Sequence, residues 1–234
     1  MRTAVVMLVA GIAVLLGTAL TTKGESATCP ANLANGINGA RGAGQLITVE
    51  AARYTTTAAT LRLWRRDRGC WVPAAGPWTA RVGRNGLADR RREGDGTTPA
   101  GVYTIGSVMY GNAPNPGVRY RYRRLVCGDW WNEDPSSPTY NTFQHVRCGT
   151  RPPFRVTTPG LWQERAYHHF AVIEFNMRPI VPGRGSGIFL HAQTGNSTNG
   201  CVSLRLPRLI AVLKWLDPAR KPLIAIGTRA SLTR

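Results

Sequence analysis

Short apolar and β-branched runs separated by glycine and proline are the feature that most constrains the fold of this chain. They lie at residues 45–50, 57–64, 71–73, 78–82, 102–105, 171–175, 188–190, 202–204 and 223–226. Strands of this length at short intervals are typical of sheets that pack on one core. The sequence therefore predicts a mainly β, β-sandwich-like fold.

One helix is expected near the C-terminus. Leu209, Val212, Leu213 and Leu216 form an i, i+3, i+4, i+7 stripe, and Pro207 precedes it at a position suited to a first helical turn. Asp217-Pro218 would end the helix. The pattern predicts one short helix after Cys201.

The N-terminus has the pattern of an export signal. Arg2 precedes an uncharged, largely apolar run from Ala4 to Leu20, and small residues follow up to Ala27. We expect residues 1–27 to be a signal peptide, or alternatively a retained N-terminal anchor. Residues 28–44 are small and aperiodic and predict a flexible lead-in, and residues 45–234 are expected to form one domain.

The charge is strongly one-sided. The 234 residues include 30 Lys plus Arg against 12 Asp plus Glu, a net charge of +18. Such a surface favours polyanionic partners. For an exported chain these are anionic cell-wall polymers rather than nucleic acid, and a membrane only if the N-terminal segment is retained. The expected location is secreted or in the cell wall.

Five cysteines in an oxidising compartment leave one thiol unpaired. We predict the bonds Cys127–Cys148, around a Trp- and Pro-rich segment, and Cys29–Cys70, at the mature N-terminus. Four cysteines allow three connectivities, so this pairing is one of three. It leaves Cys201 free. The segment between Cys127 and Cys148 fits a cross-linked lid or cleft wall, although local packing of its aromatic residues is the commoner outcome.

His191 and Cys201 lie ten positions apart, at the end of one predicted strand and the start of the next. An imidazole beside a thiol supports nucleophilic catalysis, because the thiolate is the attacking species. Gly200 allows a tight turn that brings amide donors near a developing oxyanion. His168-His169 lacks a third ligand at a suitable spacing, so no metal or other cofactor is expected.

Three motifs occur in order along the chain. They are Gly94-Asp95-Gly96-Thr97-Thr98-Pro99-Ala100-Gly101 before a strand, Gly185-Ser186-Gly187-Ile188-Phe189-Leu190-His191, and Thr198-Asn199-Gly200-Cys201-Val202. Together they resemble the L,D-transpeptidase (YkuD-like) catalytic domain, especially its exported Gram-positive versions. The resemblance covers about Gln45 to Gly227.

Two positions depart from the family's signature. Asn199 stands where a second histidine is common, and Ser203 stands where arginine or asparagine is common. His191 is therefore the only nearby base. Candidates for substrate binding are Arg184, Arg205 and Asn199.

The resemblance implies a thioester mechanism on peptidoglycan stem peptides. Cys201 would be acylated and His191 would move the proton, after which an amine (cross-linking) or water (L,D-carboxypeptidase action) would accept the acyl group. Ser197 and Thr198 would orient the histidine or form the turn, with Gly200 at the oxyanion. The alternatives are a catalytically inactive cell-wall-binding protein on the same scaffold and a thiol hydrolase of unrelated fold.

Overall fold

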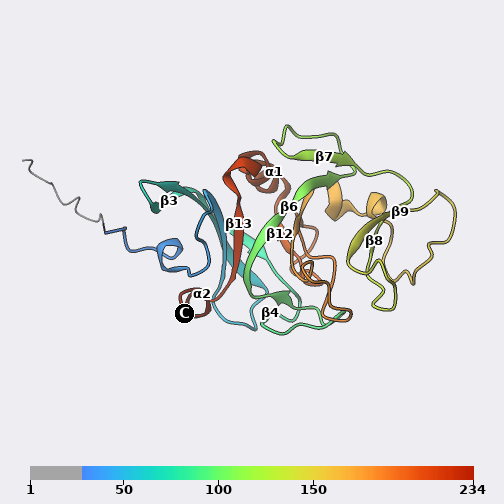
Figure 1. Cartoon of the computed structure of the whole chain (residues 1–234), viewed down its shortest axis with the longest axis horizontal. Helices are drawn as coiled ribbons and strands as arrows, with labels where there is room; N and C mark the ends of the chain where they lie inside the picture. Colours follow the sequence, from blue (N-terminus) through green and yellow to red (C-terminus); the bar gives the residue numbers. More distant parts are fainter. Residues whose placement is uncertain (1–27) are drawn as a thin grey trace, which may run out of the picture.

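A nine-stranded sheet dominates the computed structural model, which describes residues 28–234 (Figure 1). Its strand order is β10-β11-β12-β3-β2-β1-β13-β6-β7, and β10 also pairs with β6, so the sheet closes on itself. Its strands are β1 (Gln45–Ala51), β2 (Ala58–Asp67), β3 (Cys70–Arg81), β6 (Gly101–Gly111), β7 (Arg121–Arg124), β10 (Phe170–Ile173), β11 (Phe189–Ala192), β12 (Val202–Leu204) and β13 (Leu223–Gly227).

The remaining elements are short. Two two-stranded sheets join β4 (Leu87–Ala88) to β5 (Thr98–Pro99) and β8 (Asp129–Asn132) to β9 (Thr142–His145). The helices are η1 (Ala34–Gly36), η2 (Leu161–Gln163), η3 (Arg165–His168), α1 (Leu206–Trp215), η4 (Pro218–Arg220) and α2 (Arg229–Leu232). The predicted mainly β fold is thus confirmed. The runs predicted at 71–73 and 78–82 are parts of one strand, β3.

The core lies inside the closed sheet and under α1. Alternate residues of the strands point inward, and fully buried examples are Ile47, Leu61 and Leu190. Helix α1 follows β12 and buries Leu209 and Val212 against this core, as its apolar stripe predicts. Each fully buried side chain of this size contributes about 1.5–3 kcal/mol relative to an exposed one.

Residues 28–44 are packed against the sheet rather than forming the predicted flexible lead-in. Leu33, Ala34 and Ile37 are buried in a cluster with Trp64 and Trp71, which come from β2 and β3. The prediction was wrong because an aperiodic run of small residues gives no sign that two distant tryptophans offer it an apolar surface. These contacts make the segment part of the folded domain.

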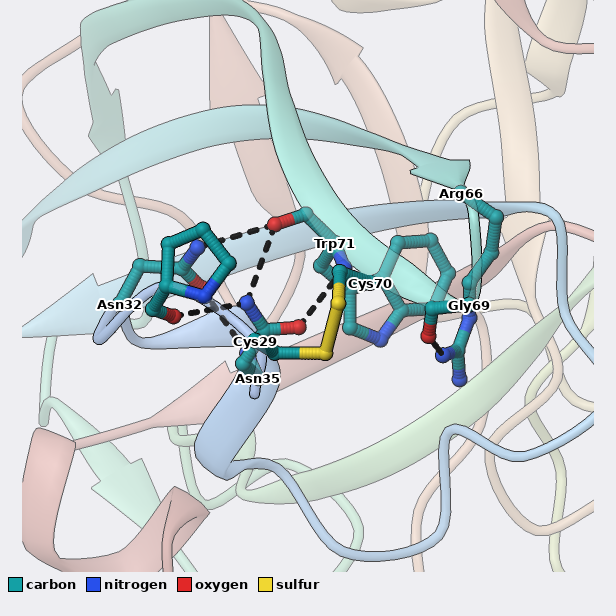
Figure 2. Close-up of a disulfide and its surroundings, with 8 residues drawn as sticks. Cys29, Asn32, Asn35, Arg66, Gly69, Cys70 and Trp71 are labelled. Carbon is teal, nitrogen blue, oxygen red and sulfur yellow. Dashed lines mark hydrogen bonds between the residues drawn. A yellow bond between two sulfur atoms is a disulfide. The ribbon is translucent and has the colours of Figure 1, made fainter. Parts of the chain in front are cut away.

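The Cys29–Cys70 disulfide fastens this segment to the start of β3 (Figure 2). Beside it, the side-chain amides of Asn32 and Asn35 donate to the Trp71 carbonyl at 2.9 and 3.1 Å, and the Trp71 N–H donates to the Asn35 Oδ1 at 2.7 Å. The Arg66 guanidinium lies 4.4 Å from the Trp71 ring centroid, within cation–π range.

The second disulfide, Cys127–Cys148, closes the β8–β9 region into a lobe. Figure 1 shows this lobe at the opposite end of the sheet from residues 28–44. The predicted pairing of the four cysteines is therefore confirmed, with Cys201 as the free thiol. The predicted signal peptide or anchor, residues 1–27, lies outside the described residues. Within residues 28–234, no helix has the length and apolar character needed to cross a membrane.

We expect the Cys29→Ser/Cys70→Ser double variant to lose about 4 kcal/mol of unfolding free energy, because the bond closes a long loop in the unfolded chain. Its cysteines are 41 residues apart, against 21 for Cys127–Cys148. The matched double variant of the shorter loop should lose about 3 kcal/mol in the same treatment. Urea denaturation measures both. An unchanged midpoint for the Cys29/Cys70 variant would contradict the account of a docked N-terminal segment.

Candidate active site

Cys201 and His191 are brought together by two neighbouring parallel strands. β11 and β12 pair His191 with Ser203. Cys201 lies two residues before Ser203, and Phe189 lies two residues before His191. Because side chains in a strand alternate between faces, Cys201 and His191 lie on the same face of the strand pair, at neighbouring positions of that face.

Both side chains line one cavity of about 460 Å³. The predicted residues Ser197, Thr198 and Asn199 line it as well. Residues that the sequence did not single out complete its walls, among them Trp131, Glu133, Leu161, Glu164 and Tyr167. The cavity therefore joins the catalytic turn to the disulfide-closed lobe and to η2 and η3.

The hydrogen bond of His191 fixes its tautomer. Its Nδ1 lies 2.8 Å from the carbonyl oxygen of Ala192, which can only accept, so Nδ1 carries the proton. The other ring nitrogen, Nε2, is therefore left with its lone pair. Burial lowers the pKa of His191 to about 4, which the bond to Ala192 only partly offsets. At neutral pH the imidazole is an uncharged base.

The thiol of Cys201 is held by the backbone of the segment that leads into β11. Sγ donates to the carbonyl of Gly187 at 3.3 Å and accepts from the N–H of Phe189 at 3.4 Å. Burial raises the pKa of Cys201 to about 12, against the lowering effect of the Phe189 amide. The resting pair is therefore a neutral thiol and a neutral imidazole, rather than a thiolate and an imidazolium.

The turn before Cys201 is held by Thr198. Its Oγ1 donates to the Cys201 carbonyl at 2.7 Å and accepts from the Gly200 N–H at 3.1 Å. Thr198 thus orients the cysteine backbone. Gly200 has φ 134°, and an added Cβ would lie 2.8 Å from Nη1 of Arg91, so only glycine fits here.

The motif at residues 94–101 supports this turn. Asp95 caps its own turn, as its side chain accepts from the Arg92 and Thr97 amides at 2.7 and 2.9 Å. Thr98 then reaches the catalytic turn, where its Oγ1 donates to the Cys201 carbonyl at 3.2 Å. The motif is therefore a structural brace for the cysteine.

Arg84 ties the same two segments together. Its backbone N–H donates to the Thr198 carbonyl at 2.7 Å, and its guanidinium bonds to the Gly94 carbonyl at 3.3 Å and to Asn199 Oδ1. Asn199, a predicted substrate-binding residue, therefore uses its side-chain oxygen in holding the turn.

A buried arginine lies behind the turn. Arg91 is 4% exposed and packs against Gly200 and Gly185. Its nearest carboxylate oxygen, on Asp95, is 3.8 Å away, and among the described residues its Nε and Nη1 have no hydrogen-bond acceptor. Its positive charge lowers the pKa of Cys201, in opposition to burial. Arg91 is thus a fixed cation directed at the catalytic turn.

The cavity itself carries acidic side chains in an otherwise basic protein. Glu133 and Glu164 both line it, and no lysine or arginine does so within residues 28–234. Burial, with a smaller effect from Glu93, raises the pKa of Glu133 to about 7. Thr158 Oγ1 lies 3.4 Å from the carboxylate of Glu133.

Asn141 connects the lobe to β11. Its Oδ1 accepts from Trp131 Nε1 at 2.9 Å and from the Gly187 N–H at 3.0 Å, and its Nδ2 donates to the carbonyls of Phe175 and Asn176. The residue that binds the Cys201 thiol, Gly187, is thereby fixed to the lobe.

The L,D-transpeptidase catalytic domain matches residues 46–226, a span that begins in β1, ends in β13 and contains the whole cavity. The chain belongs to this family. Comparisons with curated proteins and with solved structures gave no match. Membership in the L,D-transpeptidase family implies peptidoglycan as substrate, and the mainly β fold with one longer helix is consistent with it.

Several predicted residues of this L,D-transpeptidase domain lie elsewhere. Arg184 is exposed in the loop before β11 and does not line the cavity, and Arg205 lines a separate one beside Trp78. The other histidines, which were not predicted to belong to the site, are engaged elsewhere: His168 bonds to Asn112, His169 to Tyr122, and the exposed His145 to Asp129. The structure brings none of these to Cys201.

The residues that sequence analysis missed gave weak signals. Arg91 is one of three consecutive arginines, and nothing in the sequence distinguishes the buried one. Glu133 and Tyr167 enter the site only through the fold of the lobe and η3. Tyr167 packs edge-on against His191 with ring centroids 5.7 Å apart.

We expect Arg91→Met to slow alkylation of Cys201 by iodoacetamide at a given pH, because losing the cation removes an effect that lowers the thiol pKa against burial. Arg91→Lys keeps the charge and should recover part of the rate. Arg92→Met, at an exposed neighbouring position, is the matched control and should react like wild type. A folded Arg91→Met protein that reacts as fast as wild type would refute this electrostatic role.

Proposed function

We propose that this protein is an exported L,D-transpeptidase of the Gram-positive type that acylates Cys201 with peptidoglycan stem peptides in the cell wall. The observation that carries the proposal is the pairing of a free, buried thiol with an imidazole whose Nε2 is unprotonated, in one cavity of the matched domain. Two disulfides and the +18 charge support an extracytoplasmic, polyanionic setting.

Acylation begins when Sγ attacks the carbonyl carbon of the diamino-acid residue in the stem peptide. The S–H bond breaks and its proton passes to Nε2 of His191, which becomes the imidazolium. Because both groups are neutral at rest, this proton transfer accompanies the attack rather than preceding it. The carbonyl oxygen becomes an oxyanion.

Backbone donors and Arg91 stabilise the negative charge that forms. The Gly200 N–H already donates to Thr198 Oγ1. The remaining backbone donor of the turn beside the sulfur is the N–H of Cys201. Preorganised amide donors are worth about 3–4 kcal/mol to such a transition state. Arg91 acts electrostatically from behind the turn.

Collapse of the intermediate expels the terminal D-amino acid. Its nitrogen takes the proton back from His191, and the stem peptide remains as a thioester on Cys201. An amine of a neighbouring stem then attacks the thioester and forms a cross-link, or water attacks and releases a shortened stem. His191 Nε2 accepts the proton of either nucleophile, and the thiol is restored.

The test uses a purified stem tetrapeptide that ends in D-alanine. We expect wild type to release D-alanine and to form tripeptide or cross-linked dimer, measured by liquid chromatography and mass spectrometry. Cys201→Ser should form neither product, and His191→Gln should be about 10²–10⁴-fold slower because it lacks the base. His145→Gln, an exposed histidine outside the cavity, is the matched control and should keep wild-type activity.

Full activity in Cys201→Ser would contradict the proposal. No turnover by folded wild type, with Cys201 unreactive, would favour the alternative of a catalytically inactive cell-wall-binding protein.

A further inference from the structure

A second cavity, of about 1030 Å³, lies in the disulfide-closed lobe. We call it the lobe cavity. It is bounded by the Cys127–Cys148 bond and by the chain that follows, and its lining includes Trp130, Arg147, Arg151, Arg155 and Trp162. Neither Cys201 nor His191 lines it, so the catalytic mechanism gives it no role.

The lobe cavity carries a net positive charge, because three arginines and one aspartate line it. Arg147, Arg151 and Arg155 are exposed, and within residues 28–234 none of them pairs with a carboxylate. Asp134 also lines the cavity, but its carboxylate accepts from the backbone N–H groups of Ser136 and Arg155, at 3.0 and 2.9 Å. Three guanidinium groups are therefore free to bind anions, and their planar shape suits carboxylates.

Two tryptophans give the cavity an aromatic wall. The rings of Trp130 and Trp162 meet edge to face, with centroids 5.2 Å apart, and both side chains are only half-buried. Aromatic walls with a few convergent polar groups are the usual lining of ligand sites. Flat apolar faces beside cations fit a ligand that alternates rings with negative groups.

The lobe cavity shares a wall with the catalytic cavity. On β8, Trp130 lines the lobe cavity and the next residue, Trp131, lines the catalytic one, because adjacent side chains of a strand point to opposite faces. On η2, Trp162 likewise lines the lobe cavity and its neighbour Leu161 lines the catalytic cavity. A ligand in the lobe cavity is thus separated from the catalytic cavity by one layer of chain.

We propose that the lobe cavity binds an anionic saccharide segment of a cell-wall polymer, with sugar rings against Trp130 and Trp162 and carboxylates on Arg147 and Arg151. The site would hold the polymer beside the catalytic cavity while Cys201 acts on a stem peptide. Binding at this site needs no catalysis and goes beyond the transpeptidase reaction.

The test is isothermal titration of the oxidised full-length protein with three probes. Hyaluronan hexasaccharide combines sugar rings with carboxylates, chitohexaose has neutral rings, and tripolyphosphate has charge without rings. We expect hyaluronan hexasaccharide to bind most tightly. Arg147→Gln/Arg151→Gln should weaken its binding by about tenfold or more, since each bond to a charged group is worth a large part of that factor.

The control variant Arg53→Gln/Arg90→Gln removes two exposed charges that do not line the cavity and should bind like wild type. Equal weakening in the control would overturn the proposal, because net charge alone would explain the binding. Equal or tighter binding of chitohexaose or tripolyphosphate would also overturn it. Stem-peptide turnover of Arg147→Gln/Arg151→Gln should match wild type, so failure of this proposal and failure of the transpeptidase proposal give different results.

Discussion

The parallel pairing of β11 with β12 is the constraint on which the site depends. It places Cys201 one step from His191 on the same face and buries both. Burial then decides the chemistry, because it disfavours the charged forms of both groups and leaves a neutral pair. Because Nδ1 of His191 donates its proton to the hydrogen bond with the Ala192 carbonyl, Nε2 is the nitrogen with a free lone pair and acts as the base. A site of this kind deprotonates its thiol only as the sulfur attacks.

The rest of the chain serves to hold this pair rigidly. The brace at residues 94–101 bonds to the carbonyl of Cys201 through Thr98, and the lobe bonds to Gly187 through Asn141. Arg91 adds a permanent positive charge behind the turn, and this charge lowers the pKa of the free thiol against burial. Charge on the surface and charge beneath the turn therefore have different roles: solvent screens the surface charge strongly, but screens a buried one much less. The catalytic cavity differs from the surface and from the turn, because the charged residues that line it, Glu133 and Glu164, are acidic.

Sequence patterns predicted the features that depend on local periodicity or on residue chemistry. The strand runs, the stripe of α1, the cysteine pairing and the His191–Cys201 pair belong to this class. Features that depend on distant segments meeting could not be predicted in this way. The docking of residues 28–44 requires Trp64 and Trp71 to form one surface, and the burial of Arg91 requires Gly200 and Gly185 to come close to it. Periodicity also split β3 into two runs, because Pro77 and Gly76 look like a break although the strand continues.

The pH dependence of Cys201 acylation by a carbapenem, followed by intact mass, tests the neutral-pair mechanism most directly. The rate requires the lone pair of His191, which is lost as the pH falls through the histidine pKa. We expect a constant rate down to mildly acidic pH and a fall centred near the His191 pKa of about 4. Glu133→Gln should keep the same acid limb, although Glu133 itself titrates near 7 in wild type. A fall centred near 6.5, the ordinary value for histidine, or an adduct that persists in Cys201→Ser, would contradict the account.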